Sequence, residues 1–329
     1  MIIAPVMFDE KAKLCLRAAA KINLYLEVRG VRENGYHDIR SIMVPIGLHD
    51  DLTLETTRRP EIEMTVDLGE GGRCEVMGWG DDGLAAGSNL AARAATALKQ
   101  ATEYPGGASI ALKKNVPVGG GLGGGSADAA ATLMGLNELW GTGLSRQELM
   151  AVGASLGCDV PALIHGGAVS MQGVGEEVTA LQAEADGEGK GWHVVILNPG
   201  FRISTADIYS RCTCPLTSDD GEFMSMVSAL RSGDVDLAGM SLFNGLQETV
   251  FRKYPLVRLL AESLENAGAI GALVSGSGAS VFGLASDEAH AESVVKRVRE
   301  SLQVSVWSWI TRTLPDGVTA AHGPLEARV

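Results

Sequence analysis

The residues with the most evident chemistry are six glycines among the seven positions from Gly119 to Gly125, in the segment KNVPVGGGLGGGSADAA at 114–130. Glycine reaches positive φ freely and lets a backbone approach a ligand closely. Ser126, a residue suited to an N-cap, follows the glycines and opens an alanine-rich segment with apolar residues at helical spacing. Because free N–H groups and the positive end of a helix dipole meet at such a junction, we predict a phosphate site here and not a flexible linker.

Two better-known glycine loops differ from this one in their neighbouring residues. The P-loop needs Gly-Lys before Ser or Thr, whereas Gly125 is followed directly by Ser126. The pattern G-x-G-x-x-G does occur from Gly119 to Gly124, but a run this rich in glycine matches it almost by default. About twenty residues on, where a ribose-binding acid should end a second strand, Glu138 lies inside the predicted helix. A dinucleotide-binding oxidoreductase stays a remote alternative, which a nicotinamide absorbance change would revive.

Three polar residues elsewhere could act on a group that the loop holds. Lys21 and Asn23 share one face of the strand predicted at 13–28, because they alternate with apolar residues. A lysine and an asparagine in such places are usually just solvated. Asp159 lies between a predicted helix and a strand-like apolar segment at 161–171, where an aspartate is commonly a turn former. From the residues alone, the functional and the structural interpretations both stay open.

The elements that must position these residues follow from alternation and capping signals. The first half is predicted to hold strands at 13–28, 51–57, 61–68, 108–112 and 161–171. Its helices are predicted at 88–104, at 126–140, and from a Ser145–Glu148 capping box to a stop at Gly157. The second half is predicted to hold strands at 192–197, 272–275, 280–284 and 304–310, with helices beginning at Ser204, within 221–268 and at 288–302. Paired strands with helices packed on one side predict an α+β fold.

Composition narrows the classes of partner. The chain has 329 residues, a length sufficient for two domains. Its net charge of −13 argues against nucleic acid or an anionic membrane as the main partner. The N-terminus lacks the features of a signal peptide and no stretch approaches the length of a membrane span, so we predict a cytoplasmic protein with small-molecule partners. Five scattered cysteines without a C-x-x-C pair are expected to be reduced thiols.

The glycine loop at 117–130 resembles the phosphate loop of the GHMP kinases, named for galactokinase, homoserine, mevalonate and phosphomevalonate kinases. Within that superfamily, five more segments resemble the 4-diphosphocytidyl-2-C-methylerythritol kinase family in the same order: 18–28, 33–41, 88–95, 156–166 and 275–283. The resemblance implies a two-domain GHMP kinase fold. Its N-terminal domain, at 11–170, would be ribosomal-protein-S5-domain-2-like, and its C-terminal domain, at 171–315, ferredoxin-like. Ala19 departs from the family, which usually shows a proline there.

The resemblance also implies a reaction, namely ATP-dependent phosphorylation of the 2-hydroxyl of 4-diphosphocytidyl-2-C-methylerythritol, in the non-mevalonate route to isoprenoids. Asp159 would accept the hydroxyl proton, while Lys21 beside it would fix its charged state and attract the phosphoryl group. The implied ATP-binding residues are Asn89, Lys114, Pro117, Gly119, Gly120, Gly121, Leu122, Gly123, Gly124, Gly125 and Ser126. The implied substrate-binding residues are Asn23, Tyr36, His37, Asp159, Thr205, Tyr209, Gly276, Ser277 and Gly278. No protein metal site is implied: Mg²⁺ would be carried by ATP, with Ser126 as a candidate ligand.

Some alternatives stay open. Another GHMP kinase, acting on homoserine or mevalonate, fits the glycine loop equally well, and a non-catalytic nucleotide-binding module would be excluded by alcohol-dependent consumption of ATP. Tyr36 and Tyr209 would stack on cytosine and His37 would bond its edge. Without the resemblance, the two tyrosines would be expected to cover core edges and His37 to be solvated.

Overall fold

We describe the protein from a computed structural model, which places residues 12–69, 87–181, 191–212, 220–302 and 306–314. Its strands are β1 Lys13–Val31, β2 His37–Thr57, β3 Ile62–Leu68, β4 Gly107–Lys114, β5 Val169–Gly173, β6 Glu177–Ala180, β7 His193–Asn198, β8 Phe243–Asn244, β9 Ile270–Val274, β10 Val281–Ala285 and β11 Trp307–Arg312. Its helices are α1 Leu90–Thr102, α2 Gly124–Trp140, α3 Arg146–Ala154, α4 Val160–His165, α5 Thr205–Ser210, α6 Gly221–Ser232, α7 Val235–Met240, α8 Gln247–Lys253, α9 Pro255–Asn266 and α10 Glu288–Leu302.

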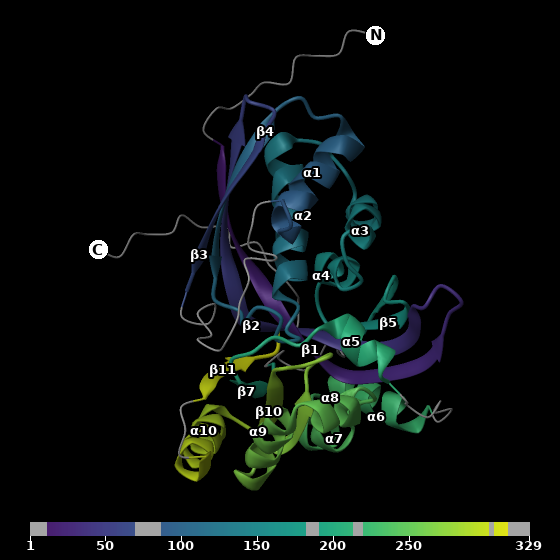
Figure 1. The fold of residues 1–329 in the computed structure, drawn as a ribbon, viewed down its shortest axis with the longest axis vertical. Coiled ribbons are helices and arrows are strands. Elements are labelled where there is room, and N and C mark those ends of the chain that lie inside the picture. The colour runs from purple at the N-terminus through teal and green to yellow at the C-terminus, as the bar shows by residue number, and fades with distance from the viewer. Residues whose placement is uncertain (1–11, 70–86, 182–190, 213–219, 303–305, 315–329) are drawn as a thin grey trace.

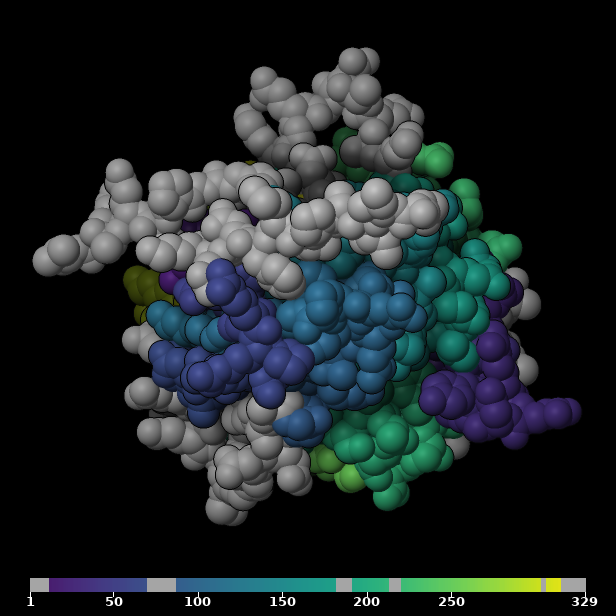
Figure 2. All heavy atoms as spheres, turned by 90° about the horizontal axis from the view of Figure 1, so that it is seen from above, coloured from purple at the N-terminus to yellow at the C-terminus, as the bar shows by residue number. Residues whose placement is uncertain are grey.

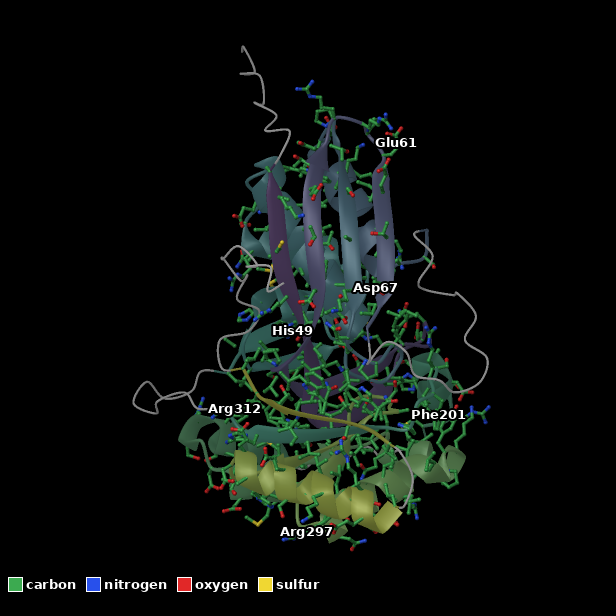
Figure 3. The ribbon with its side chains drawn as sticks, turned by 90° about the vertical axis from the view of Figure 1, so that its left-hand side faces the viewer. His49, Glu61, Asp67, Phe201, Arg297 and Arg312 are labelled. Atoms are coloured by element: carbon green, nitrogen blue, oxygen red, sulfur yellow. The ribbon has the colours of Figure 1, made fainter. Side chains whose placement is uncertain are left out.

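The larger sheet is built around the long hairpin of β1 and β2, and its main strand order is β3-β4-β2-β1-β8. β2 is long enough to pair with β4 through residues 51–57 and, toward its other end, with β5 through residues 39–43. Helices α1 to α4 lie on one side of this sheet (Figure 1). Figure 3 looks onto the opposite face, with Glu61 at the far end of the sheet and His49 toward the end where the smaller sheet begins.

Small side chains bring α1 and α2 close to each other and to the larger sheet. The core beneath these helices includes the buried alanines Ala91, Ala94, Ala95, Ala127, Ala130 and Ala131, all of which lie in or pack against α1 and α2. A Cβ added to Gly135 of α2 would lie 2.6 Å from side-chain atoms of both Leu16 and Leu54. Both predicted helices are confirmed, and close packing fixes α2 against the sheet.

The smaller sheet has the order β11-β7-β10-β9, and all its neighbours are antiparallel. In chain order β7 is followed by helices, then β9, β10, α10 and β11, which is the split βαβ arrangement of a ferredoxin-like fold. Alternate residues of β7 face opposite ways. Val195 and Leu197 pack with α9 and α10, whereas Val194 and Ile196 pack against Ile22 and its neighbours in the larger sheet. The two sheets therefore share one apolar layer.

Two strand contacts tie the end of the chain to its beginning. β8 pairs in parallel with β1 through Tyr25↔Phe243 and Leu26↔Asn244, and Ile46 forms an isolated bridge with Thr313. β5 and β6 also belong to the larger sheet, so the predicted domain boundary at residue 170 falls within β5. The larger sheet is consequently built from both halves of the chain.

The strand predicted at 161–171 is wrong over its first part and correct from Val169, where β5 begins. Residues 160–165 form α4, with Pro161 in the first turn, where its missing N–H costs nothing. Val160 to Ile164 are all buried. A short apolar run without alternation does not distinguish a buried strand from a buried helix. The predicted stop at Gly157 is wrong as well, since α3 ends at Ala154.

The cysteine prediction is partly corrected. Cys15 and Cys158 are free thiols, but Cys212 is disulfide-bonded. Among the residues that the structure describes, no helix combines the length and the apolar character that a membrane span requires.

Candidate active site

The glycine loop ends where α2 begins, and several of its glycines take backbone conformations that other residues rarely reach. φ is +67° at Gly119, +79° at Gly121 and +68° at Gly123. Gly123 is the N-cap of α2, so the prediction that Ser126 caps this helix is wrong, and Ser126 lies in its first turn. Gly123 has no side chain to satisfy the first N–H groups of the helix. These groups and the helix dipole together suit an anion.

A second glycine loop, at 275–280, supports the first. The Ser275 hydroxyl donates to the Gly121 carbonyl at 3.0 Å, and the Ser280 N–H donates to the Gly120 carbonyl at 2.9 Å. A Cβ on Gly121 would lie 2.1 Å from the Ser275 carbonyl oxygen. Gly121 is therefore required by the contact between the two loops as well as by its own φ.

Lys21 and Asp159 meet beside the glycine loop. The Lys21 Nζ lies 3.3 Å from the Asp159 carboxylate and donates to Asn23 Oδ1 at 2.7 Å. β1 and β2 shift register between Ala19 and Lys21, and there the Lys21 N–H donates to the Leu122 carbonyl of the loop at 2.9 Å. Such irregularities in a ladder commonly aim a side chain at a site. The same strand thus binds the loop with its backbone and Asp159 with its side chain.

Burial separates Lys21 and Asn23 from ordinary solvated residues. Both are nearly inaccessible, because the smaller sheet and the second glycine loop pack over the part of β1 that carries them. The Lys21 side chain is 5% exposed, whereas that of Asp159 is 29% exposed. Asp159 precedes α4 without capping it through its side chain, so the carboxylate is directed to Lys21 and not to a turn.

A buried hydrogen-bond chain fixes the Asn23 amide. Its Nδ2 donates to the Ser41 hydroxyl at 2.9 Å, and that hydroxyl donates to the Tyr25 carbonyl at 2.7 Å. This arrangement turns Asn23 Oδ1 toward Lys21. Ser41 was not predicted: it ends the segment 33–41 that resembles the family, but its hydrogen-bond partners, Asn23 and Tyr25, come from another strand.

Aromatic side chains gather on the other side of Asp159. The rings of His37 and Tyr209 lie 5.0 Å apart at 54°, and Tyr36 is 58% exposed nearby on the turn between β1 and β2. This turn projects at the edge of the molecule (Figure 2). Burial raises the pKa of the Tyr209 hydroxyl, with a further contribution from the charge of Asp159, so the phenol stays neutral. Thr205 Oγ1 lies 2.8 Å from Ser277 Oγ and links α5 to the second glycine loop.

Lys114 and Asn89 lie on the opposite side of the glycine loop. Asn89 caps α1 by accepting from the Ala91 N–H at 2.9 Å. The Lys114 ammonium is buried and donates to Asp128 Oδ2 at 2.6 Å and to Asp50 Oδ2. Burial acts to lower the pKa of Lys114, but the charges of Asp128 and Asp50 outweigh it and raise that pKa. Two of the three ammonium protons are therefore committed to protein carboxylates.

One cavity of about 910 Å³ joins these groups, a size within the usual range for small-molecule sites. Every predicted catalytic and ATP-binding residue lines it, as do the predicted substrate-binding residues except Gly278. Gly278 instead closes the second glycine loop by donating its N–H to the Ser275 carbonyl at 2.9 Å. The lining also includes residues that the sequence did not indicate, among them Ser88, Asp128, Cys158 and Ile203.

The donor set at the cavity fits a metal ion that arrives with a phosphate ligand better than a resident one. Among the described residues no group of three His, Cys, Asp or Glu side chains could hold a metal. Ser126, at the start of α2, lines the cavity beside the glycines. A single hydroxyl could complete the oxygen coordination of Mg²⁺ whose other ligands are phosphate and water.

Comparisons with known proteins show the family to which the chain belongs. Residues 89–167 match the family described as GHMP kinases N terminal domain, and residues 226–304 match GHMP kinases C terminal. A 4-diphosphocytidyl-2-C-methyl-D-erythritol kinase from Symbiobacterium thermophilum is 38% identical, over 90% of this chain and 98% of its own. One from Pelotomaculum thermopropionicum is also 38% identical, over 86% of this chain and 93% of its own.

Solved structures extend the agreement to the whole fold. A crystal structure of 4-(cytidine 5'-diphospho)-2C-methyl-D-erythritol kinase superposes with a TM-score of 0.69 at 30% identity, covering 91% of this chain and 99% of the other. The homoserine kinase of Cytophaga hutchinsonii superposes with a TM-score of 0.70 at 18% identity, covering 97% and 99%, which shows a shared fold alone. The predicted α+β GHMP kinase fold is confirmed. The chain belongs to the 4-diphosphocytidyl-2-C-methyl-D-erythritol kinase family of the GHMP kinases.

Proposed function

We propose that this protein transfers the γ-phosphoryl group of ATP to the 2-hydroxyl of 4-diphosphocytidyl-2-C-methyl-D-erythritol, in the non-mevalonate route to isoprenoids. The observation that carries the proposal is the Lys21–Asp159 pair, 3.3 Å apart, between the glycine loop and the aromatic group of Tyr36, His37 and Tyr209. The cavity thus contains, one beside the next in space, a glycine loop that can bind phosphates, an acid–base pair and a group of aromatic side chains. Family membership at 38% identity supports the same reaction.

Asp159 acts as the general base in this proposal. Its partly exposed carboxylate can meet a substrate hydroxyl and accept its proton, and the Lys21 ammonium lies 3.3 Å from it. As the hydroxyl oxygen bonds to the γ-phosphorus, the bond from that phosphorus to the bridging oxygen breaks and ADP leaves. Lys21 and the N–H groups of the glycine loop would stabilise the negative charge of the phosphate oxygens during the transfer. Asn23 holds Lys21 in place through its Oδ1.

The phosphates of ATP would lie along the residues from Gly119 to Ser126, at the first turn of α2. Ser126 Oγ is the side chain that would hold Mg²⁺ carried with ATP, which supplies neutralisation of the phosphate charge. Asn89, Lys114 and Pro117 line the far side of the loop and would contact the rest of the nucleotide.

The cytidyl group would be recognised at the aromatic end of the cavity. Tyr36 and Tyr209 offer faces for a pyrimidine, and His37 offers a ring nitrogen for its edge. Thr205, Gly276 and Ser277 approach from the second half of the chain and would close on the diphosphate or the polyol.

Incubation with ATP, Mg²⁺ and a panel of alcohols tests the proposal, with the mass of each phosphorylated product as the readout. We expect rapid gain of one phosphoryl group by 4-diphosphocytidyl-2-C-methyl-D-erythritol and slow or no gain by free methylerythritol, homoserine and mevalonate. Equal turnover of homoserine or mevalonate would contradict the substrate while leaving a kinase. Consumption of ATP without any alcohol would contradict both.

Two further proposals concern the domain boundary and the location of the protein. We infer two domains with the boundary after β6 instead of at residue 170, because β5 and β6 extend the larger sheet. A cytoplasmic location with small-molecule partners stays a prediction from the sequence.

A further inference from the structure

Two aspartates that take no part in the proposed chemistry, Asp50 and Asp128, meet Lys114 beneath the glycine loop. Asp50 comes from β2, Lys114 from the end of β4 and Asp128 from α2. All three are buried, with exposed fractions of 0%, 3% and 1%. Lys114 Nζ donates to both carboxylates, so one ammonium joins three elements.

Asp50 and Asp128 are connected to opposite ends of the glycine loop. Asp50 Oδ1 accepts from the backbone N–H groups of Asn115 at 2.6 Å and Val116 at 2.8 Å, the residues that lead into the glycines. Asp128 belongs to α2, into which the glycines run. Gly124 lies directly over Asp50, since a Cβ there would be 3.3 Å from its Oδ2. The three residues therefore connect the beginning of the loop to its end from below.

Protonation of Asp128 limits the negative charge of this group. Burial raises the pKa of Asp128 to about 8, against the opposing effect of Lys114 and in the same direction as the charge of Asp50. The raised pKa favours the protonated carboxyl at neutral pH, so Asp128 adds little negative charge beneath a loop that must receive phosphates.

We propose that Asp50, Lys114 and Asp128 are positioning residues that hold the two ends of the glycine loop at the separation that ATP binding requires. The inference rests on the proposed function only in taking ATP as the ligand of the loop. Asp50 and Asp128 act through Lys114 and the backbone. Loss of the Lys114–Asp50 or the Lys114–Asp128 interaction would let the loop sample conformations in which its N–H groups no longer converge. Nucleotide affinity would then fall, while the cytidyl end of the cavity stays intact.

The test compares Asp128→Ala and Asp128→Asn with the unaltered protein by calorimetric titration, using a nonhydrolysable ATP analogue and, separately, cytidine 5'-diphosphate. Asp128→Ala should raise the Kd of the ATP analogue about tenfold or more, since it removes one of the two carboxyl groups that hold the buried Lys114 ammonium and so disconnects α2 from β4. Asp128→Asn keeps an oxygen that accepts from Lys114 and should recover most of that affinity. Amide hydrogen exchange within residues 119–125 should speed up in the Ala variant alone.

Glu27→Ala is the matched control, because Glu27 is 1% exposed, accepts from Arg40 Nε at 3.1 Å and does not line the cavity. It should lower the melting temperature without changing the Kd of the ATP analogue. Asp50→Asn, which conserves volume, replaces Asp128→Ala if the latter fails to fold. An unchanged Kd and unchanged exchange in a folded, destabilised variant would overturn the proposal. Failure of cytidine 5'-diphosphate to bind the unaltered protein would count against the proposed substrate and not against this inference.

Discussion

At the scale of single residues, the proposed division of labour between Lys21 and Asp159 follows from their unequal burial. The ammonium is held from behind by Asn23, whereas the carboxylate keeps one side toward the cavity. Asp159→Asn conserves size and removes the proton acceptor, so kcat should fall by about 10²- to 10⁴-fold. Steady-state kinetics measures the fall. Titration with an ATP analogue serves as the control and should give an unchanged Kd, and near-normal kcat in the variant would exclude Asp159 as the base.

Ser41 allows a second residue-scale test, since it touches Asn23 and not the cavity. Ser41→Ala leaves Asn23 Nδ2 without its buried acceptor, and the amide can then rotate away from Lys21. We expect kcat to fall about tenfold with little change in the KM for ATP. Ser41→Thr keeps the hydroxyl and should restore kcat. Ser170→Ala removes another buried serine of the larger sheet and should leave kcat unchanged. An equal loss in both alanine variants would indicate a general packing effect.

Tyr36 tests the substrate end, because its exposure lets it change without disturbing the core. Tyr36→Ala should raise the KM for the cytidyl substrate about tenfold, in keeping with 1 to 3 kcal/mol for stacking a base on an aromatic ring. Tyr36→Phe keeps the ring face and should behave almost like the unaltered protein. Kinetics with each substrate varied in turn gives the answer. A change confined to the KM for ATP would place the nucleotide, and not the cytidyl group, against Tyr36.

At the scale of elements, the glycine loop is constrained by the strand beside it. A Cβ on Gly123 would lie 2.8 Å from Cγ and 2.9 Å from Cε of Lys21, in addition to requiring a φ of +68° from a residue with a side chain. Gly123→Ala should therefore displace Lys21 and lower both ATP affinity and kcat.

Gly141→Ala separates the strain of a positive φ from the displacement of Lys21. Gly141 ends α2 with a similar φ of +62°, but a Cβ there would meet nothing within 4 Å. Both variants should lose about 1 kcal/mol in the free energy of unfolding from backbone strain, and only Gly123→Ala should lose activity. Urea denaturation and steady-state kinetics measure the two quantities. Equal activity in the two variants would contradict a contact between the loop and Lys21.

The sequence was informative about elements with local signals. The capping box of Ser145 and Glu148 is present, Asn89 caps α1, and Ser204 caps α5. Local signals failed in α4, because a segment that is buried all round shows no alternation of polar and apolar residues. They also missed most of β2, which is buried without interruption from Arg40 to Ile46 as the strand passes from β4 to β5.

The same distinction holds for the candidate site. The glycines were evident because their chemistry is contiguous in the chain, and the resemblance to a family pointed to Lys21 and Asp159. Ser41 and Asp50 could not be identified, because their meaning comes from partners that are distant in sequence and adjacent only in the folded sheet. The individual roles of the lining residues stay predictions until variants are measured.

At the scale of the whole molecule, the buried charges link stability to pH. The pKa of Asp128 is raised from 3.8 to about 8, chiefly by burial. As pH rises from about 4 to about 8, the unfolded chain releases this proton while the folded chain keeps it, so the free energy of unfolding falls across that window. In Asp128→Asn this fall should be shallower. Urea denaturation at a series of pH values measures the difference, and parallel curves for the two proteins would contradict the assignment.

The pairing of β1 with β8 has a consequence for how the protein is made. Lys21 and Asn23 lie in a strand whose last neighbour, Phe243–Asn244, is translated long after the strand itself. Pairings so distant in sequence form slowly, and until β8 emerges from the ribosome the edge of β1 presents unpaired backbone groups. A chain released before β8 is synthesised would therefore be an aggregation-prone fragment and not a partly active kinase. We expect the nascent chain to need protection from aggregation until its second half has been synthesised.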